Sequence, residues 1–314
     1  MRKIKSLNLM VTDRCNGACN MCNIWKSESF KELNLNDLIK FLKLPEFSEV
    51  EDLSISGGEP MLKSDIQQFS VDLIKVLPKL KMFFINTNGL MPEKTLKLAR
   101  VLIKNCSFLN KELQLFFSIS IEGPKEVHEL IRGRSYDLPI QTISLLKNLI
   151  SDNLKVILSM TIQRDNYKFI AQTSDLAKSL GCDFSFRFVD FSENYYNNIS
   201  TNNISLNRKE ASKVLEEIKN EFKEDRFFQV LYSSVCKGVN NIMVSLDGKL
   251  ICQAGRIFIF IKNDGNIYPC IYSEQIIGNI KEGLFPFKLD RLKSCPCCTE
   301  CHIYPMLNFA KHKK

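Results

Sequence analysis

The chain has 314 residues, of which 45% are hydrophobic and 25% are charged, and its formal net charge is +8. These proportions are ordinary for a globular protein, and the length suffices for one large domain and a small one. No apolar run is long enough to cross a membrane, and no secretory signal precedes the first run, so we expect a cytoplasmic protein without a membrane partner. The positive charge forms no basic stripe interleaved with aromatic residues, which argues against a nucleic-acid partner.

Short apolar runs alternate with longer amphipathic stretches up to about residue 222. This alternation predicts a parallel sheet with right-handed crossovers, and six unequal repeats predict an α/β fold, a partial (β/α)6 TIM-like barrel. In such barrels the chemistry lies at the C-terminal ends of the strands. The expected strands are 7–11, 53–56, 82–86, 113–121, 155–162 and 183–189, and the expected helices are 34–44, 66–77, 92–103, 139–150, 167–180 and 208–222.

The character of the sequence changes after about Asp225, where short strands, turns and cysteines follow. We therefore divide the chain into a barrel domain, 1–225, and a small cysteine-rich α+β domain, 226–314. The stretch 192–207 is rich in Asn and Ser, and this composition predicts a surface loop.

Three of the twelve cysteines lie within eight residues, directly after the first expected strand: Cys15, Cys19 and Cys22. Three thiolates on one loop predict a soft-metal site, whereas a structural zinc site needs a fourth ligand that is missing nearby. A [4Fe–4S] cluster takes one Cys per iron, so three cysteines leave one iron open to a small molecule. The alternative, three buried cysteines without a metal, is disfavoured by their regular spacing.

This CX3CX2C spacing resembles the motif of the radical S-adenosylmethionine (radical SAM) enzymes, in which the open iron binds SAM. The resemblance implies that Cys15, Cys19 and Cys22 hold a [4Fe–4S] cluster that cleaves SAM to a 5′-deoxyadenosyl radical. Met21 stands where the family usually has an aromatic residue, and it would cover the adenine.

Gly57-Gly58-Glu59-Pro60 follows the second expected strand and matches the segment that binds the SAM amino group in this family. Glycines permit close approach of a ligand to the backbone, and Glu59 supplies an acceptor for the ammonium. The resemblance also implies SAM contacts from polar residues whose strand phase points into the barrel, with a satisfied interior network as the alternative. These residues are Asn86, Ser118, Ser120 and Glu122, the last replacing a frequent Asp. Arg187 is expected to clamp a carboxylate or phosphate if it points inward, or to form a surface salt bridge.

Four further cysteines, Cys252, Cys270, Cys298 and Cys301, provide enough thiolates for one [4Fe–4S] cluster or one zinc ion. A hairpin turn at Gly265 would bring the strands flanking it, and thus Cys252 and Cys270, together. The surrounding sequence resembles the SPASM/twitch extension of radical SAM enzymes. That resemblance implies a single auxiliary cluster, because Leu307 and Lys311 occupy the positions that a second one needs.

Other cysteines leave alternatives open. Cys295 forms a second CX2C pair with Cys298 and could replace Cys301. Cys106 and Cys182 are expected in the core, while Cys236 is either a buried thiol, a hydrogen-atom donor as in some radical SAM epimerases, or a replacement ligand. His128 is expected on a helix surface without a catalytic role.

Taken with the resemblance, the sequence predicts an enzyme that oxidises, epimerises or cross-links a peptide or small-molecule substrate. Its electrons would come from a flavodoxin- or ferredoxin-type donor. The competing hypothesis is a non-catalytic metal-binding or redox-sensing protein with structural zinc or iron–sulfur sites.

Overall fold

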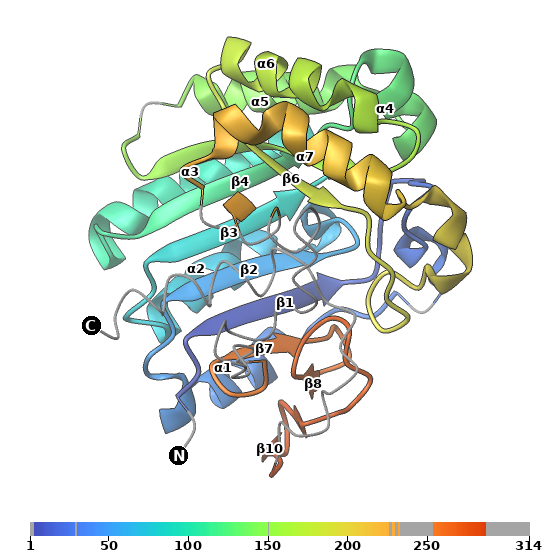
Figure 1. The fold of residues 1–314 in the computed structure, drawn as a ribbon. Coiled ribbons are helices and arrows are strands. Elements are labelled where there is room, and N and C mark those ends of the chain that lie inside the picture. Colours follow the sequence, from blue (N-terminus) through green and yellow to red (C-terminus); the bar gives the residue numbers. More distant parts are fainter. Residues whose placement is uncertain are drawn as a thin grey trace.

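The computed structural model describes residues 3–28, 30–149, 151–225, 228–229, 232 and 254–286. Its described part is built on one sheet with the strand order β10-β9-β8-β7-β1-β2-β3-β4-β5-β6 (Figure 1). Strands β1 to β6 follow each other in sequence order and every pairing among them is parallel. Their bounds are β1 (Ser6–Thr12), β2 (Asp52–Gly57), β3 (Met82–Thr87), β4 (Gln114–Ser120), β5 (Leu154–Ile162) and β6 (Asp183–Phe188).

Helices connect these strands and confirm the α/β partial barrel expected from the alternation. Residue patterns explain several helix ends: the Asn34 side chain accepts a hydrogen bond from the Asp37 N–H at the start of α1, and Asn207 and Glu210 form a capping box at α7. The helices are α1 (Leu35–Leu42), α2 (Ile66–Val76), α3 (Pro92–Leu109), α4 (Lys125–Arg132), α5 (Asp137–Lys147), α6 (Ile170–Ser179) and α7 (Arg208–Phe222). The short helix α4 is not among the helices expected from the sequence.

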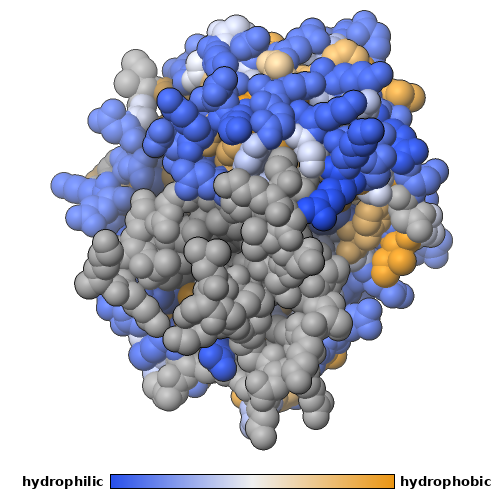
Figure 2. Space-filling model, viewed as in Figure 1, coloured by the Kyte–Doolittle hydropathy of each residue, from blue (hydrophilic) through white to orange (hydrophobic). Residues whose placement is uncertain are grey.

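The main core lies between the parallel strands and the helices packed on them. In β4 the side chains of Leu115, Phe117 and Ile119 are fully buried, whereas Ser118 and Ser120 on the opposite face are half-buried. This is the alternation expected for a strand with one face toward the helices and one toward the barrel interior. On the face shown in Figure 2, the described surface over α6 and α7 is mostly hydrophilic. None of the described helices is long and apolar enough to span a bilayer.

The described C-terminal strands continue the same sheet. Strand β7 (Phe258–Ile261) pairs in parallel with β1, and β8 (Asn266–Tyr268) returns antiparallel to β7. Gly265 in the turn between them has φ +87°, and a Cβ there would lie 3.0 Å from the Ile280 side chain, which confirms the predicted hairpin turn. The short strands β9 (Gly278–Asn279) and β10 (Gly283–Leu284) complete this edge. The domain division at residues 225 and 226 stays a prediction.

The segment 192–207 is only in part the surface loop that its composition predicts, because its first half is anchored by buried side chains while several others are exposed. Ser192 and Asn198 are buried, Tyr195 and Tyr196 are 9% exposed, and only the following turn, η5 (Ile199–Ile204), presents an exposed apolar side chain at Ile199. We call residues 190–198 the bridging segment, because they contact three separate parts of the molecule.

Candidate functional site

The cysteine loop leaves β1 at the C-terminal edge of the sheet, as predicted. Its three cysteines carry free thiols, with Cys19 buried and Cys15 and Cys22 half-buried. The backbone N–H of Gly17 donates a hydrogen bond to the Sγ of Cys15 at 3.3 Å. A Cβ on Gly17 would lie 3.4 Å from the Cys15 Sγ and 3.5 Å from the Cys19 Sγ, so both sulfurs flank the same point of the loop.

The loop is suited to bind a group that carries positive charge. Burial raises the pKa of Cys15 to about 12 and that of Cys22 to about 11, and nearby Glu59 adds to the increase at Cys15. A metal ligand must be a thiolate, so the positive charge of bound iron would favour loss of the proton from these buried thiols. Among the described residues, no three His, Cys, Asp or Glu side chains converge closely enough to hold a single metal ion. Three neighbouring thiols of this kind fit a multi-iron cluster, in which each Cys binds a different iron.

The glycine-rich turn after β2 packs directly on the start of the cysteine loop. Gly58 donates its N–H to the Thr12 carbonyl at 2.8 Å, and Glu59 donates its N–H to the Arg14 carbonyl at 2.7 Å. A Cβ on Gly58 would lie 2.1 Å from the Arg14 oxygen, so only glycine fits there, and Gly57 has φ +126°. The structure therefore brings together the two motifs singled out in the sequence.

The Glu59 side chain is fully buried, and its carboxylate accepts three hydrogen bonds from the protein. Met61 N–H and Thr87 Oγ1 donate to Oε1 at 3.0 and 2.8 Å, and Asn88 N–H donates to Oε2 at 2.8 Å. Burial raises the pKa of Glu59, while these donors and Arg132 act to lower it. The carboxylate thus joins the turns that follow β2 and β3.

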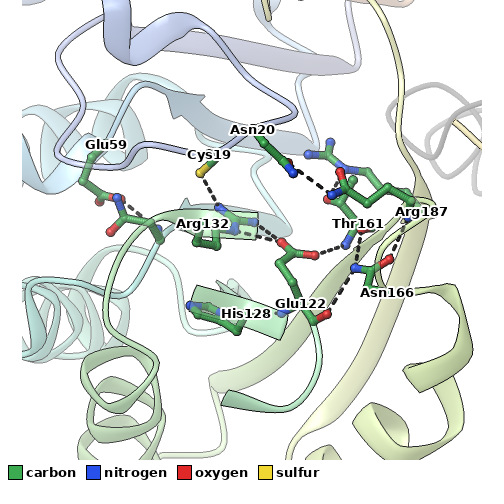
Figure 3. A network of polar contacts seen from close by, with 11 residues as sticks. Cys19, Asn20, Glu59, Glu122, His128, Arg132, Thr161, Asn166 and Arg187 are labelled. Atoms are coloured by element: carbon green, nitrogen blue, oxygen red, sulfur yellow. Dashed lines mark hydrogen bonds and ion pairs between the residues drawn. The ribbon is translucent and has the colours of Figure 1, made fainter. Parts of the chain in front are cut away.

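Arg132, in the last turn of α4, joins the cysteine loop to Glu122, which follows the end of β4 (Figure 3). Its Nη1 donates to the Cys19 Sγ at 3.6 Å, its Nε donates to the Glu122 Oε1 at 2.8 Å, and its Nη2 forms an ion pair with the same oxygen. The other Glu122 oxygen accepts the Thr161 N–H at 2.8 Å. The Glu122 side chain is completely buried and that of Arg132 is 14% exposed.

His128 belongs to the same network, and its expected surface position is wrong. It is 1% exposed, and its Nδ1 accepts the Glu122 backbone N–H at 3.2 Å. Burial lowers the pKa of His128 to about 3, with a smaller contribution from the charge of Arg132, so the imidazole is neutral. A local sequence pattern gives no sign of this role, because the partner lies six residues earlier on another element.

Other predicted SAM contacts also lie at the C-terminal ends of the strands. Asn86 donates to the Ser54 Oγ at 2.9 Å. Arg187 donates to the Thr161 Oγ1 at 3.3 Å, and its guanidinium lies 5.5 Å from the centre of the Tyr196 ring. Arg187 is therefore directed into the network of Figure 3. Met21 is 7% exposed, between two cysteines of the loop.

The sequence gives no sign that the bridging segment holds the site together. It holds the cysteine loop and the glycine turn at once: Asn198 donates to the Met21 carbonyl at 2.7 Å, and the Gly57 N–H donates to the Tyr195 hydroxyl at 3.0 Å. Asn23 adds a further contact by donating its N–H to the Tyr196 carbonyl at 2.9 Å.

The same segment contacts the chain that follows Cys270. Tyr272 donates its hydroxyl to the Asp190 Oδ2 at 3.0 Å, Ser192 donates to the Ile271 carbonyl at 2.6 Å, and Asn194 donates to the Ser273 carbonyl at 3.0 Å. Burial raises the pKa of Asp190 to about 6, although Arg187 and the Tyr272 hydroxyl act to lower it.

Cys270 is 2% exposed and packs with Ala254, Phe258 and Tyr272. Core positions are also found for Cys106, which is fully buried, and Cys182, which is half-buried. The predicted partners of Cys270, namely Cys252, Cys298 and Cys301, lie outside the described residues, as do Cys236 and Cys295.

Residues 9–177, more than half of the chain, match the Radical SAM superfamily. The chain belongs to this superfamily. It is 24% identical over 295 residues to a GTP 3′,8-cyclase of Sulfurimonas denitrificans, covering 90% of this chain and 86% of the relative. It is 22% identical over 333 residues to the sporulation killing factor maturation protein SkfB of Bacillus subtilis, covering 98% of this chain and 73% of the relative.

Solved radical SAM structures share the fold. Streptococcus suis SuiB bound to S-adenosylmethionine matches 94% of this chain and 67% of its own, with a TM-score of 0.65 and 17% identity. The enzyme anSMEcpe, with bound AdoMet and the Cp18Cys peptide, matches 98% of this chain and 99% of its own, with a TM-score of 0.62 and 18% identity. Membership of the superfamily confirms the predicted enzyme class and its cofactors, a [4Fe–4S] cluster and SAM.

Proposed function

We propose that Cys15, Cys19 and Cys22 hold the SAM-binding cluster of an enzyme that removes a hydrogen atom from a peptide substrate. When bound, the cluster supplies the electron that cleaves SAM into methionine and a 5′-deoxyadenosyl radical, which removes that atom. The observation that carries the proposal is the close packing of the cysteine loop on the Gly57-Gly58-Glu59 turn at the C-terminal edge of the sheet. The protein contributes positions, hydrogen bonds and exclusion of water.

We favour a peptide over a small molecule because solved structures that match the fold over most of this chain contain bound peptides. SuiB has been solved bound to the precursor peptide SuiA, and anSMEcpe with the Cp18Cys peptide. A small-molecule substrate is the second candidate, since GTP 3′,8-cyclases are similar over nearly the whole chain. Oxidation, epimerisation and cross-linking all begin with the same hydrogen abstraction, and the electron donor is proposed to be a flavodoxin or ferredoxin.

The proposed SAM contacts come from the cysteine loop, the glycine turn, the strands β3, β4 and β6, and the residue Glu122 after β4. In both Glu59 and Glu122 the Oε2 atom accepts a single hydrogen bond from the described residues, so a SAM group can bind this oxygen without replacing a protein donor. The proposed contacts are Met21, Gly57, Gly58, Glu59, Asn86, Ser118, Ser120, Glu122 and Arg187.

A second proposed site holds one auxiliary [4Fe–4S] cluster on Cys252, Cys270, Cys298 and Cys301, with Cys295 as the alternative to Cys301. Support comes from Cys270, a buried thiol close to the end of the hairpin strand β8. A cluster with four thiolates has no open iron, so we assign it electron transfer or support of the fold. Cys236 is proposed as a hydrogen-atom donor to the substrate radical.

The test compares SAM cleavage in the reconstituted wild type and in a Cys15→Ala/Cys19→Ala/Cys22→Ala variant under dithionite. The variant should lose about four irons and all 5′-deoxyadenosine production. A Cys182→Ala variant is the matched control, because its thiol lies away from the loop and should not affect either quantity. Undiminished 5′-deoxyadenosine in the triple variant contradicts the proposal. Incubation with GTP in place of a peptide distinguishes the two substrate classes.

A further inference from the structure

We propose that Arg132 is a positioning residue that sets the reduction potential of the cluster through its hydrogen bond to the Sγ of Cys19. The inference rests on the proposed function, since it requires Cys19 to bind iron. It concerns the free enzyme before SAM arrives, and it assigns Glu122 the task of limiting the effect of the Arg132 charge.

The guanidinium lies between a sulfur and a carboxylate. Arg132 Nη1 is 3.6 Å from the Cys19 Sγ, and its Nε and Nη2 both bind the Glu122 Oε1. A guanidinium stays protonated in proteins, so the charge next to the sulfur is permanent. With 14% of the Arg132 side chain and none of Glu122 exposed, water screens this charge only weakly.

Backbone hydrogen bonds between α4 and the cysteine loop fix the position of the Arg132 guanidinium relative to the Cys19 sulfur. The end of α4 accepts two N–H groups from the cysteine loop, one on each side of Cys19: Ala18 donates to the Arg132 carbonyl at 3.2 Å and Asn20 to the Ile131 carbonyl at 2.9 Å. Gly133 follows with φ +61°, and a Cβ there would be 3.0 Å from the Ala18 side chain. The contact between Arg132 and Cys19 is thus built into the packing of α4 on the loop.

The direction of the effect follows from charge. Reduction adds an electron to the cluster and its sulfurs, and a cationic donor stabilises that added charge, which raises the reduction potential. The Glu122 carboxylate partly cancels the guanidinium charge and so opposes this increase. Removing the positive charge and removing the negative charge must therefore shift the potential in opposite directions.

The experiment is a redox titration, followed by electron paramagnetic resonance, of the full-length reconstituted protein without SAM. The signal of the SAM-binding cluster is identified afterwards by its change on SAM addition. Arg132→Gln should lower the ratio of reduced to oxidised cluster at least tenfold at a fixed potential, equivalent to about 59 mV for one electron. Glu122→Gln should shift the ratio the other way.

Arg134→Gln is the matched control. Arg134 lies two residues further along and donates to the carbonyls of Asn16 and Gly133, but these bonds are exposed and do not involve a sulfur. This variant removes the same formal charge from the same neighbourhood, and it should change the ratio less than twofold.

Shifts of equal size in Arg132→Gln and Arg134→Gln, or shifts of the same sign in Arg132→Gln and Glu122→Gln, overturn the inference. If Arg132→Gln does not assemble a cluster, Glu122→Gln decides instead. An unshifted reduction potential in Glu122→Gln also overturns the inference. A wild type without any cluster that responds to SAM contradicts the proposed function, which is a separate outcome.

Discussion

The backbone N–H of Gly57 donates a hydrogen bond to the hydroxyl of Tyr195 at 3.0 Å, although the two residues are 138 positions apart. Through this bond the bridging segment holds the glycine turn that packs on the cysteine loop. The Tyr195 ring packs edge-on against Tyr196 and Phe260, so its position is fixed independently of the hydroxyl.

Tyr195→Phe should retain the ring packing and leave the Gly57 N–H without its acceptor. An unsatisfied donor of this kind costs about 1–3 kcal/mol, so we expect a lower free energy of unfolding and weaker SAM binding. Chemical denaturation and isothermal titration measure the two quantities. Tyr136→Phe is the control, because the hydroxyl of Tyr136 forms no hydrogen bond within the described part of the chain. Equal effects of both substitutions would contradict the role of Tyr195.

Glu59→Gln should weaken SAM binding without loss of iron. The glutamine amide must turn its NH2 group toward one of three protein donors, which loosens the turns after β2 and β3 at a cost of about 1–3 kcal/mol. Calorimetry should show SAM affinity reduced about tenfold or more. Glu49→Gln serves as control, because Glu49 is only partly buried and pairs with Lys79. Iron loss in Glu59→Gln would show that the carboxylate supports cluster assembly instead.

The auxiliary site can be tested by its iron content. The reconstituted wild type should carry about eight irons, and Cys298→Ala/Cys301→Ala should carry about four while still cleaving SAM without forming product. Inductively coupled plasma mass spectrometry distinguishes the outcomes. Each cluster takes about four irons, so about twelve irons in the wild type would show a further cluster. Such a cluster would use Cys236, Cys295 and Cys297. About four irons with one zinc ion would show a structural site.

Asp52 should make the stability of the fold dependent on pH. It is 6% exposed at the N-terminal end of β2, and its Oδ1 has no hydrogen-bond partner among the described residues. Burial raises the pKa of Asp52 to about 7, with Glu51 adding to the increase and Lys81 opposing it. Since the folded state favours the neutral acid, its stability contribution is complete below about pH 4 and is lost as the pH rises to 7.

Asp52→Asn should therefore raise the free energy of unfolding at pH 8 by up to about 4 kcal/mol and change it little at pH 4. Denaturation curves at both pH values measure this difference, with the exposed Asp175→Asn as control. An equal gain at pH 4 and pH 8 would mean that the effect does not come from the charge of Asp52.

The sequence was most informative where a short stretch contains both the ligands and the turn that presents them. Cys15 to Cys22 and Gly57 to Glu59 could be placed correctly because each follows a recognisable strand, and the phase of β4 could be predicted from simple alternation. The hairpin at Gly265 was predictable for the same reason, since the turn residues determine it locally.

Residues whose roles depend on distant partners could not be predicted. Asn198 lies in a stretch with the composition of a surface loop, yet its amide donates to the carbonyls of Met21 and Asp190. His128 is buried and accepts a backbone N–H. Arg132 is positioned by its contacts with Glu122 and Cys19. Local composition gives the polarity of such side chains but not the backbone groups that three-dimensional packing brings to them.

The pairing of β7 with β1 has a consequence for the order in which the molecule can fold. Strand β1 is translated long before its second neighbour in the sheet, Phe258–Ile261. Until then one edge of β1, directly before the cysteine loop, has unpaired backbone groups that can recruit other chains. Slow closure of such a distant contact favours aggregation during synthesis, so high expression levels and low temperature should have opposite effects on the yield of folded protein.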